Sequence, residues 1–146
     1  MTNSRPLVLI VDDEPDMCWV LKNLLGEDEF DLRIAQTGDA ALSFLASNTF
    51  SIALLDAKLT DMDGLDLARR MKAIDPWINI VMVSGYYYKD DVDIRAAMDN
   101  ELIVGFIAKP FVHRDVIEML NVCRRTNWES RGAQHEESLG QRQAWG

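Results

Sequence analysis

The chain has 146 residues, of which 48% are hydrophobic and 27% charged, a composition typical of one folded domain with its own core. Its formal net charge of −9 argues against a nucleic-acid-binding surface on this domain, because phosphate backbones attract clustered Lys and Arg. No apolar run approaches the roughly 20 residues that span a bilayer, and the N-terminus lacks a secretory signal. Cys18 and Cys123 have no metal-ligand spacing and are interpreted as buried free thiols of a reducing compartment, so a cytoplasmic location is expected.

Short apolar runs alternate with longer helical patterns along the chain, which predicts βαβ units around a parallel sheet. The first strand spans Leu7–Val11 and leads into a helix from Pro15 to near Gly26, where an Asp or Glu before the proline can cap the helix. The remaining strands are predicted at 31–36, 51–56, 78–84 and 104–108, and the remaining helices at 40–48, 65–74, 89–100 and 113–127.

The polarity of the strands predicts their order in the sheet. Four of the runs are almost wholly apolar, as expected of strands covered on both faces, whereas the run 31–36 is more polar and suits an edge. Right-handed crossovers then favour a flavodoxin-like α/β fold, a doubly wound (βα)5 parallel sheet with strand order 2-1-3-4-5. We expect the domain to cover residues 1–126 and the polar, aperiodic stretch 127–146 to be a tail or the start of a linker.

Polar residues follow four of these strands, at their carboxyl ends: Asp12 and Asp13, then Asp56, Ser84 and Lys109. The carboxyl ends of parallel strands share one edge of a sheet, so these side chains can meet in one pocket. Three carboxylates suit Mg²⁺, and a carboxylate such as Asp56 can form an aspartyl phosphate. Lys109 would then pair with the phosphoryl oxygens and Ser84 would hydrogen bond to them. Each residue alone could be a helix cap or a solvated side chain, but that does not explain all of them together.

The segments LVLIVDDEPDM, LLDAKLTDMDGLDLARRM, VMVSG and FIAKPF resemble the receiver domain of two-component response regulators, over roughly residues 6 to 125. The resemblance implies that Asp56 accepts a phosphoryl group from a sensor histidine kinase or a phosphotransfer protein. It also implies an Mg²⁺ ion, bound by Asp12, Asp13, Asp56 and the backbone carbonyl of Lys58. The segment around VDDEPDM favours receivers that precede ATPase-type transcription activators.

The same resemblance implies a switch that acts on other molecules by contact rather than an enzyme with an external substrate. Ser84 and Lys109 would contact the phosphoryl group. Phe106, which the pattern alone would place in the core, matches an aromatic position that turns inward when the hydroxyl residue moves to the phosphate. The fourth helix, the fifth strand and the last helix would form the output surface, which could also support a homodimer.

Some positions depart from the family pattern. Ser84 stands where Thr is commoner, and Phe106 where Tyr is frequent. The stretch between Ser84 and Lys109 looks a few residues longer than usual and contains three consecutive tyrosines, 86–88. Tyr86 and Lys58, each two positions after a site residue, predict an altered lifetime of the phosphoryl state.

Two other functions fit the sequence less well. A Mg²⁺-dependent phosphatase with an aspartyl intermediate usually carries its nucleophile and acid two positions apart after the first strand, whereas Asp12 and Asp13 are adjacent. A flavodoxin-like electron carrier would need a Ser/Thr-rich phosphate loop after that strand.

Two local features stay open at the level of sequence. The first helix is more apolar than one buried stripe requires, so either it is deeply flanked or Trp19 and a neighbour form a docking patch for the kinase. The Lys109-Pro110 bond could be cis, which would aim the lysine into the pocket.

Overall fold

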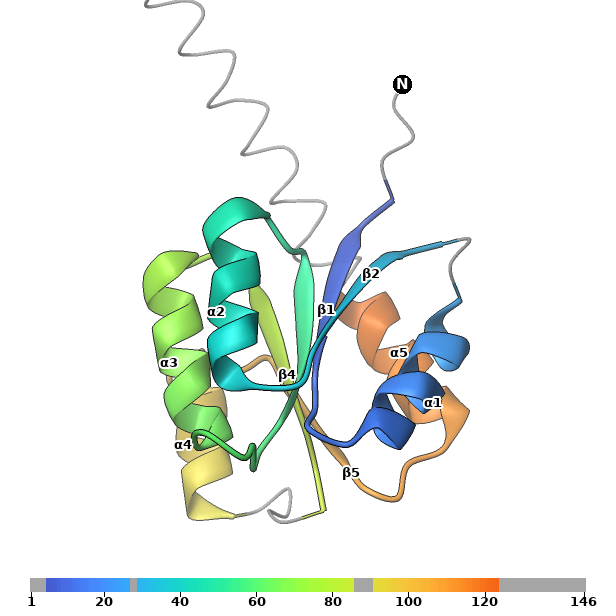
Figure 1. Cartoon of the computed structure of the whole chain (residues 1–146). Coiled ribbons are helices and arrows are strands. Elements are labelled where there is room, and N and C mark those ends of the chain that lie inside the picture. Colours follow the sequence, from blue (N-terminus) through green and yellow to red (C-terminus); the bar gives the residue numbers. More distant parts are fainter. Residues whose placement is uncertain (1–4, 27–28, 86–90, 124–146) are drawn as a thin grey trace, which may run out of the picture.

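The computed structural model describes residues 5–26, 29–85 and 91–123, in which strands and helices alternate (Figure 1). The elements in chain order are β1 (Leu7–Val11), α1 (Pro15–Leu25), β2 (Asp31–Ala35), α2 (Gly38–Ser47), β3 (Ile52–Asp56), α3 (Gly64–Ile74), β4 (Asn79–Ser84), α4 (Val92–Asp99), β5 (Gly105–Ala108) and α5 (His113–Cys123).

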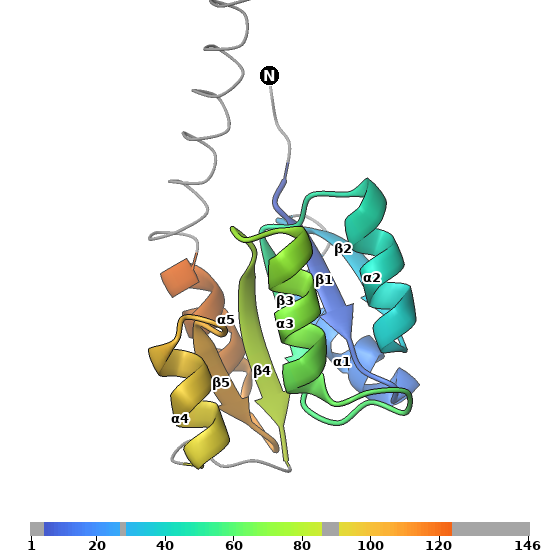
Figure 2. The ribbon, with the colours of Figure 1, turned by 90° about the vertical axis from the view of Figure 1, so that its left-hand side faces the viewer.

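The strands form one parallel sheet in the order β2-β1-β3-β4-β5, which confirms the predicted fold. Helices α1 and α5 cover one face of this sheet, and α2, α3 and α4 cover the other (Figures 1 and 2). Strand β2 lies on one side of β1 and strand β3 on the other, so the order in which the chain adds strands to the sheet reverses between β1 and β3. In open α/β sheets, ligands bind at such a switch point, beyond the carboxyl ends of the strands.

Both faces of the central strands are apolar because both are covered by helices. In β1, Leu9 and Val11 pack toward α2 and α3, whereas Val8 and Ile10 pack toward α1 and α5. This alternation follows from the two-residue period of a strand. The edge strand β2 buries only Ala35 fully, as its polar sequence predicted.

Helices α2, α3 and α4 each begin with a side-chain cap. Thr37 accepts a hydrogen bond from the Ala40 N–H at the start of α2, and Asp63 and Asp91 cap α3 and α4 in the same way. The predicted cap of α1 is wrong: Glu14 holds the capping position but makes no side-chain cap. Instead, the Asp12 carboxylate accepts a hydrogen bond from the Glu14 N–H at 2.9 Å. The turn before α1 is therefore held by Asp12, one of the predicted site residues.

Several predictions fall on residues outside the described ranges. These are the tyrosines 86–88, the first residues of the predicted helix 89–100, the end of the predicted helix 113–127, the domain boundary at 126 and the tail 127–146. Among the helices that the structure describes, none combines the length and the apolarity that crossing a bilayer requires.

Helix α1 is not deeply flanked. It buries Cys18, Leu21 and Leu25, but leaves Trp19 65% and Val20 38% exposed. Cys18 and Cys123 are both buried and free, as predicted.

Candidate functional site

Neighbouring strands bring the acidic residues together. Val11, the last residue of β1, pairs with Leu55 in β3, so Asp12 and Asp56 follow at the same level of the sheet. Asp12 is 2% exposed and Asp56 8% exposed. With the half-buried Asp13, they place one carboxylate oxygen each within 4.8 Å of one another. The structure therefore brings together the three carboxylates that the sequence singled out.

Lys109 reaches this cluster from the end of the edge strand β5. It follows β5, and its backbone N–H donates to the carbonyl of Ser84 at 3.0 Å. Its side chain extends past β4, so that Nζ lies 3.1 Å from Asp12 Oδ2 and 3.6 Å from Asp56 Oδ1. The Lys109-Pro110 bond is cis.

The electrostatics of the cluster are those of crowded negative charge. Burial raises the pKa of the Asp56 carboxyl to about 6, and the Asp12 and Asp13 carboxylates act in the same direction. Lys109 and the backbone N–H of Lys58 oppose this rise without cancelling it. Burial alone would lower the pKa of Lys109, but Asp12 and Asp56 outweigh it and raise that pKa, so the lysine stays charged.

This donor set fits a hard divalent cation. Mg²⁺ prefers oxygen ligands and is commonly held by one or two carboxylates together with waters and phosphate oxygens. The three carboxylate oxygens within 4.8 Å meet that requirement, and Asp12 raises the pKa of Asp56, which burial raises most, by more than Lys109 lowers it, so part of the repulsion between the carboxylates remains. A bound cation would relieve the remainder.

The other predicted residues lie around the cluster. Ser84 ends β4, is 1% exposed and comes one residue after Val83, the register partner of Asp56. Lys58 is exposed on the loop after β3. Its backbone N–H donates a hydrogen bond to Asp56, and its backbone forms an isolated antiparallel β-bridge with that of Asp63. The position of its carbonyl as a ligand stays a prediction.

Phe106 lies away from the carboxylates. It sits on β5 opposite Met82 and is half-buried. Its side chain lines a groove of about 750 Å³ between α4 and α5, together with Met98 and Met119. Its role as a switch stays a prediction.

The close approach of α3 to the end of β3 requires a glycine. The Gly64 N–H donates to the carbonyl of Ala57 at 2.7 Å. A Cβ at position 64 would strike the backbone oxygen of Asp56 and the Cα of Ala57. Any larger residue here would displace the strand end that carries Asp56.

Two loop residues at the site escaped the sequence analysis. Thr60 Oγ1 donates to Asp13 Oδ2 at 2.9 Å, and the Asp61 carboxylate accepts from the N–H groups of Gly38 and Asp39 at 2.9 and 3.1 Å. Thr60 and Asp13 are 47 positions apart. No local pattern links residues at that distance, so only the folded loop could show the contact.

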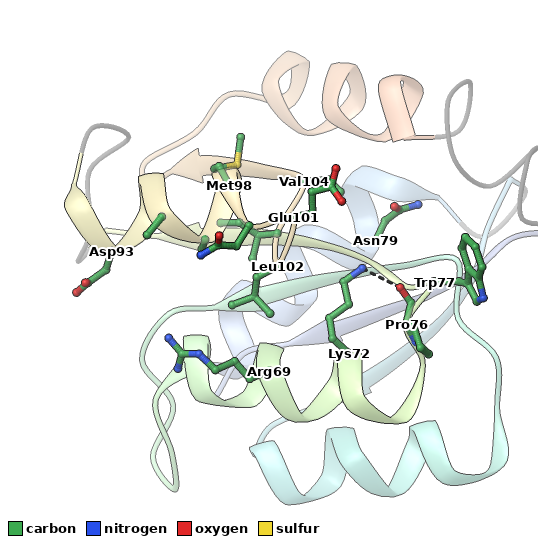
Figure 3. Close-up of a pocket in the computed structure, with 14 residues that line it drawn as sticks. Arg69, Lys72, Pro76, Trp77, Asn79, Asp93, Met98, Glu101, Leu102 and Val104 are labelled. Atoms are coloured by element: carbon green, nitrogen blue, oxygen red, sulfur yellow. Dashed lines mark hydrogen bonds between the residues drawn. The ribbon is translucent and has the colours of Figure 1, made fainter.

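A larger groove, of about 880 Å³, lies at the opposite end of the sheet between α3 and α4 (Figure 3). Lys72 and Trp77 line it, and Lys72 Nζ donates to the carbonyl of Pro76 at 3.1 Å. Its walls include Asn79, the first residue of β4, and none of the predicted site residues. It is therefore separate from the carboxylate cluster.

Comparison with known proteins identifies the family. Residues 8–121 match the model of the family described as response regulator receiver domain. This chain belongs to that family.

Individual relatives agree with this assignment of the receiver domain. The nitrogen assimilation regulatory protein NtrX of Azorhizobium caulinodans is 32% identical over 106 residues, which cover 71% of this chain and 23% of that protein. The response regulator protein PilR of Pseudomonas aeruginosa is 37% identical over 83 residues, covering 57% of this chain and 19% of that protein. The chain thus spans less than a quarter of either regulator.

A solved structure gives the same result for the fold. The CheY-like response regulator receiver domain protein of Methanospirillum hungatei superposes with a TM-score of 0.74 at 28% identity. The superposition covers 92% of this chain and 99% of that one.

Proposed function

We propose that this receiver domain is a phosphorylation-dependent switch that accepts a phosphoryl group on Asp56 from a sensor histidine kinase or a phosphotransfer protein. The observation that carries the proposal is the convergence of Asp12, Asp13 and Asp56 within 4.8 Å, with Lys109 Nζ 3.6 Å from Asp56 Oδ1. Such a cluster can hold a cation and a phosphoryl group at the same place.

In the proposed reaction, a carboxylate oxygen of Asp56 attacks phosphorus in line. An O–P bond forms, the P–N bond of the donor phosphohistidine breaks, and the imidazole nitrogen keeps the electron pair. Asp12, Asp13, Asp56 and the carbonyl of Lys58 would hold Mg²⁺, which neutralises charge on the phosphoryl oxygens when bound. The ammonium of Lys109, which lies 3.6 Å from Asp56 Oδ1, would pair with one of the new oxygens, and the Ser84 hydroxyl would hydrogen bond to another.

The output surface in this proposal is the face formed by α4, β5 and α5. The groove beside Phe106 supports it, because an aromatic ring that turns inward would change the shape of a surface lined by Met98 and Met119. A homodimer through this face is part of the proposal. The names of relatives, such as the transcriptional regulatory protein ZraR of Escherichia coli, support a transcriptional output, in line with the expected ATPase-type activator.

The exposed side chains of Trp19 and Val20 support a docking patch on α1 for the kinase. Lys58 is exposed beside Asp56, which supports a role with Tyr86 in the lifetime of the phosphoryl state. Timing phosphate loss in Lys58→Ala and Tyr86→Ala tests the second point, and unchanged decay in both would contradict it.

The central test is incubation with Mg²⁺ and a small acyl phosphate such as acetyl phosphate, followed by intact mass measurement. One labile phosphoryl group should appear on the wild-type protein and on Asp99→Asn, a control at an exposed aspartate of α4. Asp56→Asn should carry none. An unmodified wild type would overturn the proposal, and steady phosphate release from diverse phosphoesters would instead indicate a phosphatase.

A further inference from the structure

The loop between β3 and α3 is held on two sides by consecutive residues. On one side Thr60 Oγ1 donates to Asp13 Oδ2 at 2.9 Å. On the other side the Asp61 carboxylate accepts two backbone N–H bonds at the start of α2. Through these hydrogen bonds the loop links the turn after β1 to the N-terminus of α2.

We propose that Thr60 is a positioning residue for Asp13, with Asp61 as the anchor that keeps Thr60 in place. The inference rests on the proposed Mg²⁺ site. A hydroxyl that donates to Asp13 Oδ2 restricts rotation of the carboxylate and would leave Oδ1 available to a bound cation. Hydrogen-bond partners of metal-binding carboxylates orient them and so raise the affinity for the metal.

The anchor at Asp61 has a clear physical basis. Its two carboxylate oxygens accept hydrogen bonds from the N–H groups of Gly38 and Asp39, which lie in the first turn of α2, where backbone donors have no partner within the helix. Negative charge is also favoured there by the helix dipole. These two hydrogen bonds lower the pKa of Asp61, so the carboxylate stays ionised and the anchor persists.

The rest of the loop is closed as well. The Leu59 N–H donates to the carbonyl of Met62 at 3.2 Å, and the backbones of Lys58 and Asp63 form an isolated antiparallel β-bridge. Met62 also packs against Gly38, where an added Cβ would strike its side chain. Thr60 thus projects from a tight turn whose base is tied to both β3 and α2.

A purely structural role for Thr60 predicts a different result. The Thr60 side chain is exposed, and an exposed hydrogen bond contributes little to folding because water replaces the lost partner. Under the positioning role, loss of the hydroxyl should therefore leave the melting temperature in EDTA unchanged and weaken Mg²⁺ binding, whereas under a purely structural role it would lower that melting temperature.

The experiment measures Mg²⁺ affinity of the full chain by isothermal titration calorimetry. Thr60→Val and Thr60→Ala should each weaken binding about 10-fold, whereas Thr60→Ser, which keeps the hydroxyl, should restore it. Thr49→Val is the matched control, because Thr49 is an exposed threonine just before the opposite end of β3. Asp61→Ala should weaken binding by releasing the loop.

The outcomes separate the two proposals. Wild-type binding of Mg²⁺ with unchanged affinity in both Thr60→Val and Thr60→Ala overturns the positioning role and leaves the proposed function intact. A wild-type protein that binds no Mg²⁺ and gains no phosphoryl group overturns the proposed function, and this inference with it.

Discussion

Lys109 lies between two carboxylates of neighbouring strands, with Nζ 3.1 Å from Asp12 Oδ2 and 3.6 Å from Asp56 Oδ1. The lysine side chain is 15% exposed, and those of Asp12 and Asp56 are 3% and 9% exposed. Solvent therefore screens these charges poorly. In the absence of a metal ion, Lys109 compensates charge that the fold itself has crowded together.

Replacing Lys109 by methionine should lower the free energy of unfolding by about 3 kcal/mol in EDTA at pH 8, because buried carboxylates lose their partner. Urea unfolding measures this loss, and added Mg²⁺ should reduce it. Arg5→Met is the control, since the Arg5–Asp31 pair is 45% and 41% exposed and should contribute under about 1 kcal/mol. Equal losses in the two variants would contradict the assigned role of Lys109.

The stability of the metal-free protein should fall as pH rises from about 4 to 6. The pKa of Asp56 is about 6 in the folded protein against 3.8 for an ordinary aspartate, so the folded state binds more protons in this window. By linkage the free energy of unfolding then falls with pH, by about 3 kcal/mol at most.

Asp56→Asn should remove this slope and be the more stable protein above pH 7. Urea unfolding in EDTA across the pH range compares the two proteins. Parallel profiles for wild type and Asp56→Asn would show that the slope has another origin.

Gly64→Ala should destabilise the protein by about 2 kcal/mol or more, because the added methyl group meets the backbone of Asp56 and Ala57. Phosphorylation of Asp56 should fall as well, since the strand end moves. Gly85→Ala is the matched control: its Cβ would meet Lys109 at an ordinary 3.6 Å, so stability should change by less than about 0.5 kcal/mol. Thermal and urea unfolding of both variants tests the contrast.

Glu101→Gly should stabilise the protein by about 1 kcal/mol. Glu101 has φ of 61° at the end of α4, where its N–H donates to Met98 and the next N–H, that of Leu102, to Ala97. Glycine adopts this left-handed conformation without the steric cost of a Cβ. Asn100→Gly, at φ −88°, should give no such gain, and a stability of Glu101→Gly below that of wild type would contradict the argument.

The residue pattern alone was enough for the architecture and for which residues at the strand ends meet. Apolar runs such as IALL before Asp56 predicted buried parallel strands, and the polar run 31–36 predicted the edge, both confirmed by the strand order. Because the carboxyl ends of parallel strands share one edge, Asp12, Asp13, Asp56 and Lys109 could be expected in one place. That inference needs only topology, which periodicity and crossover handedness determine.

Tertiary structure alone decided the contacts made by side chains on loops. The Thr60–Asp13 hydrogen bond, the Asp61 anchor on α2 and the absence of a side-chain cap from Glu14 depend on the path of each loop and the rotamer of each side chain. The exposure of Trp19 likewise depends on how α1 is rotated against the sheet. Strand pattern constrains where an element ends, but the direction of a polar side chain beyond that end is set by partners that can lie 47 positions away.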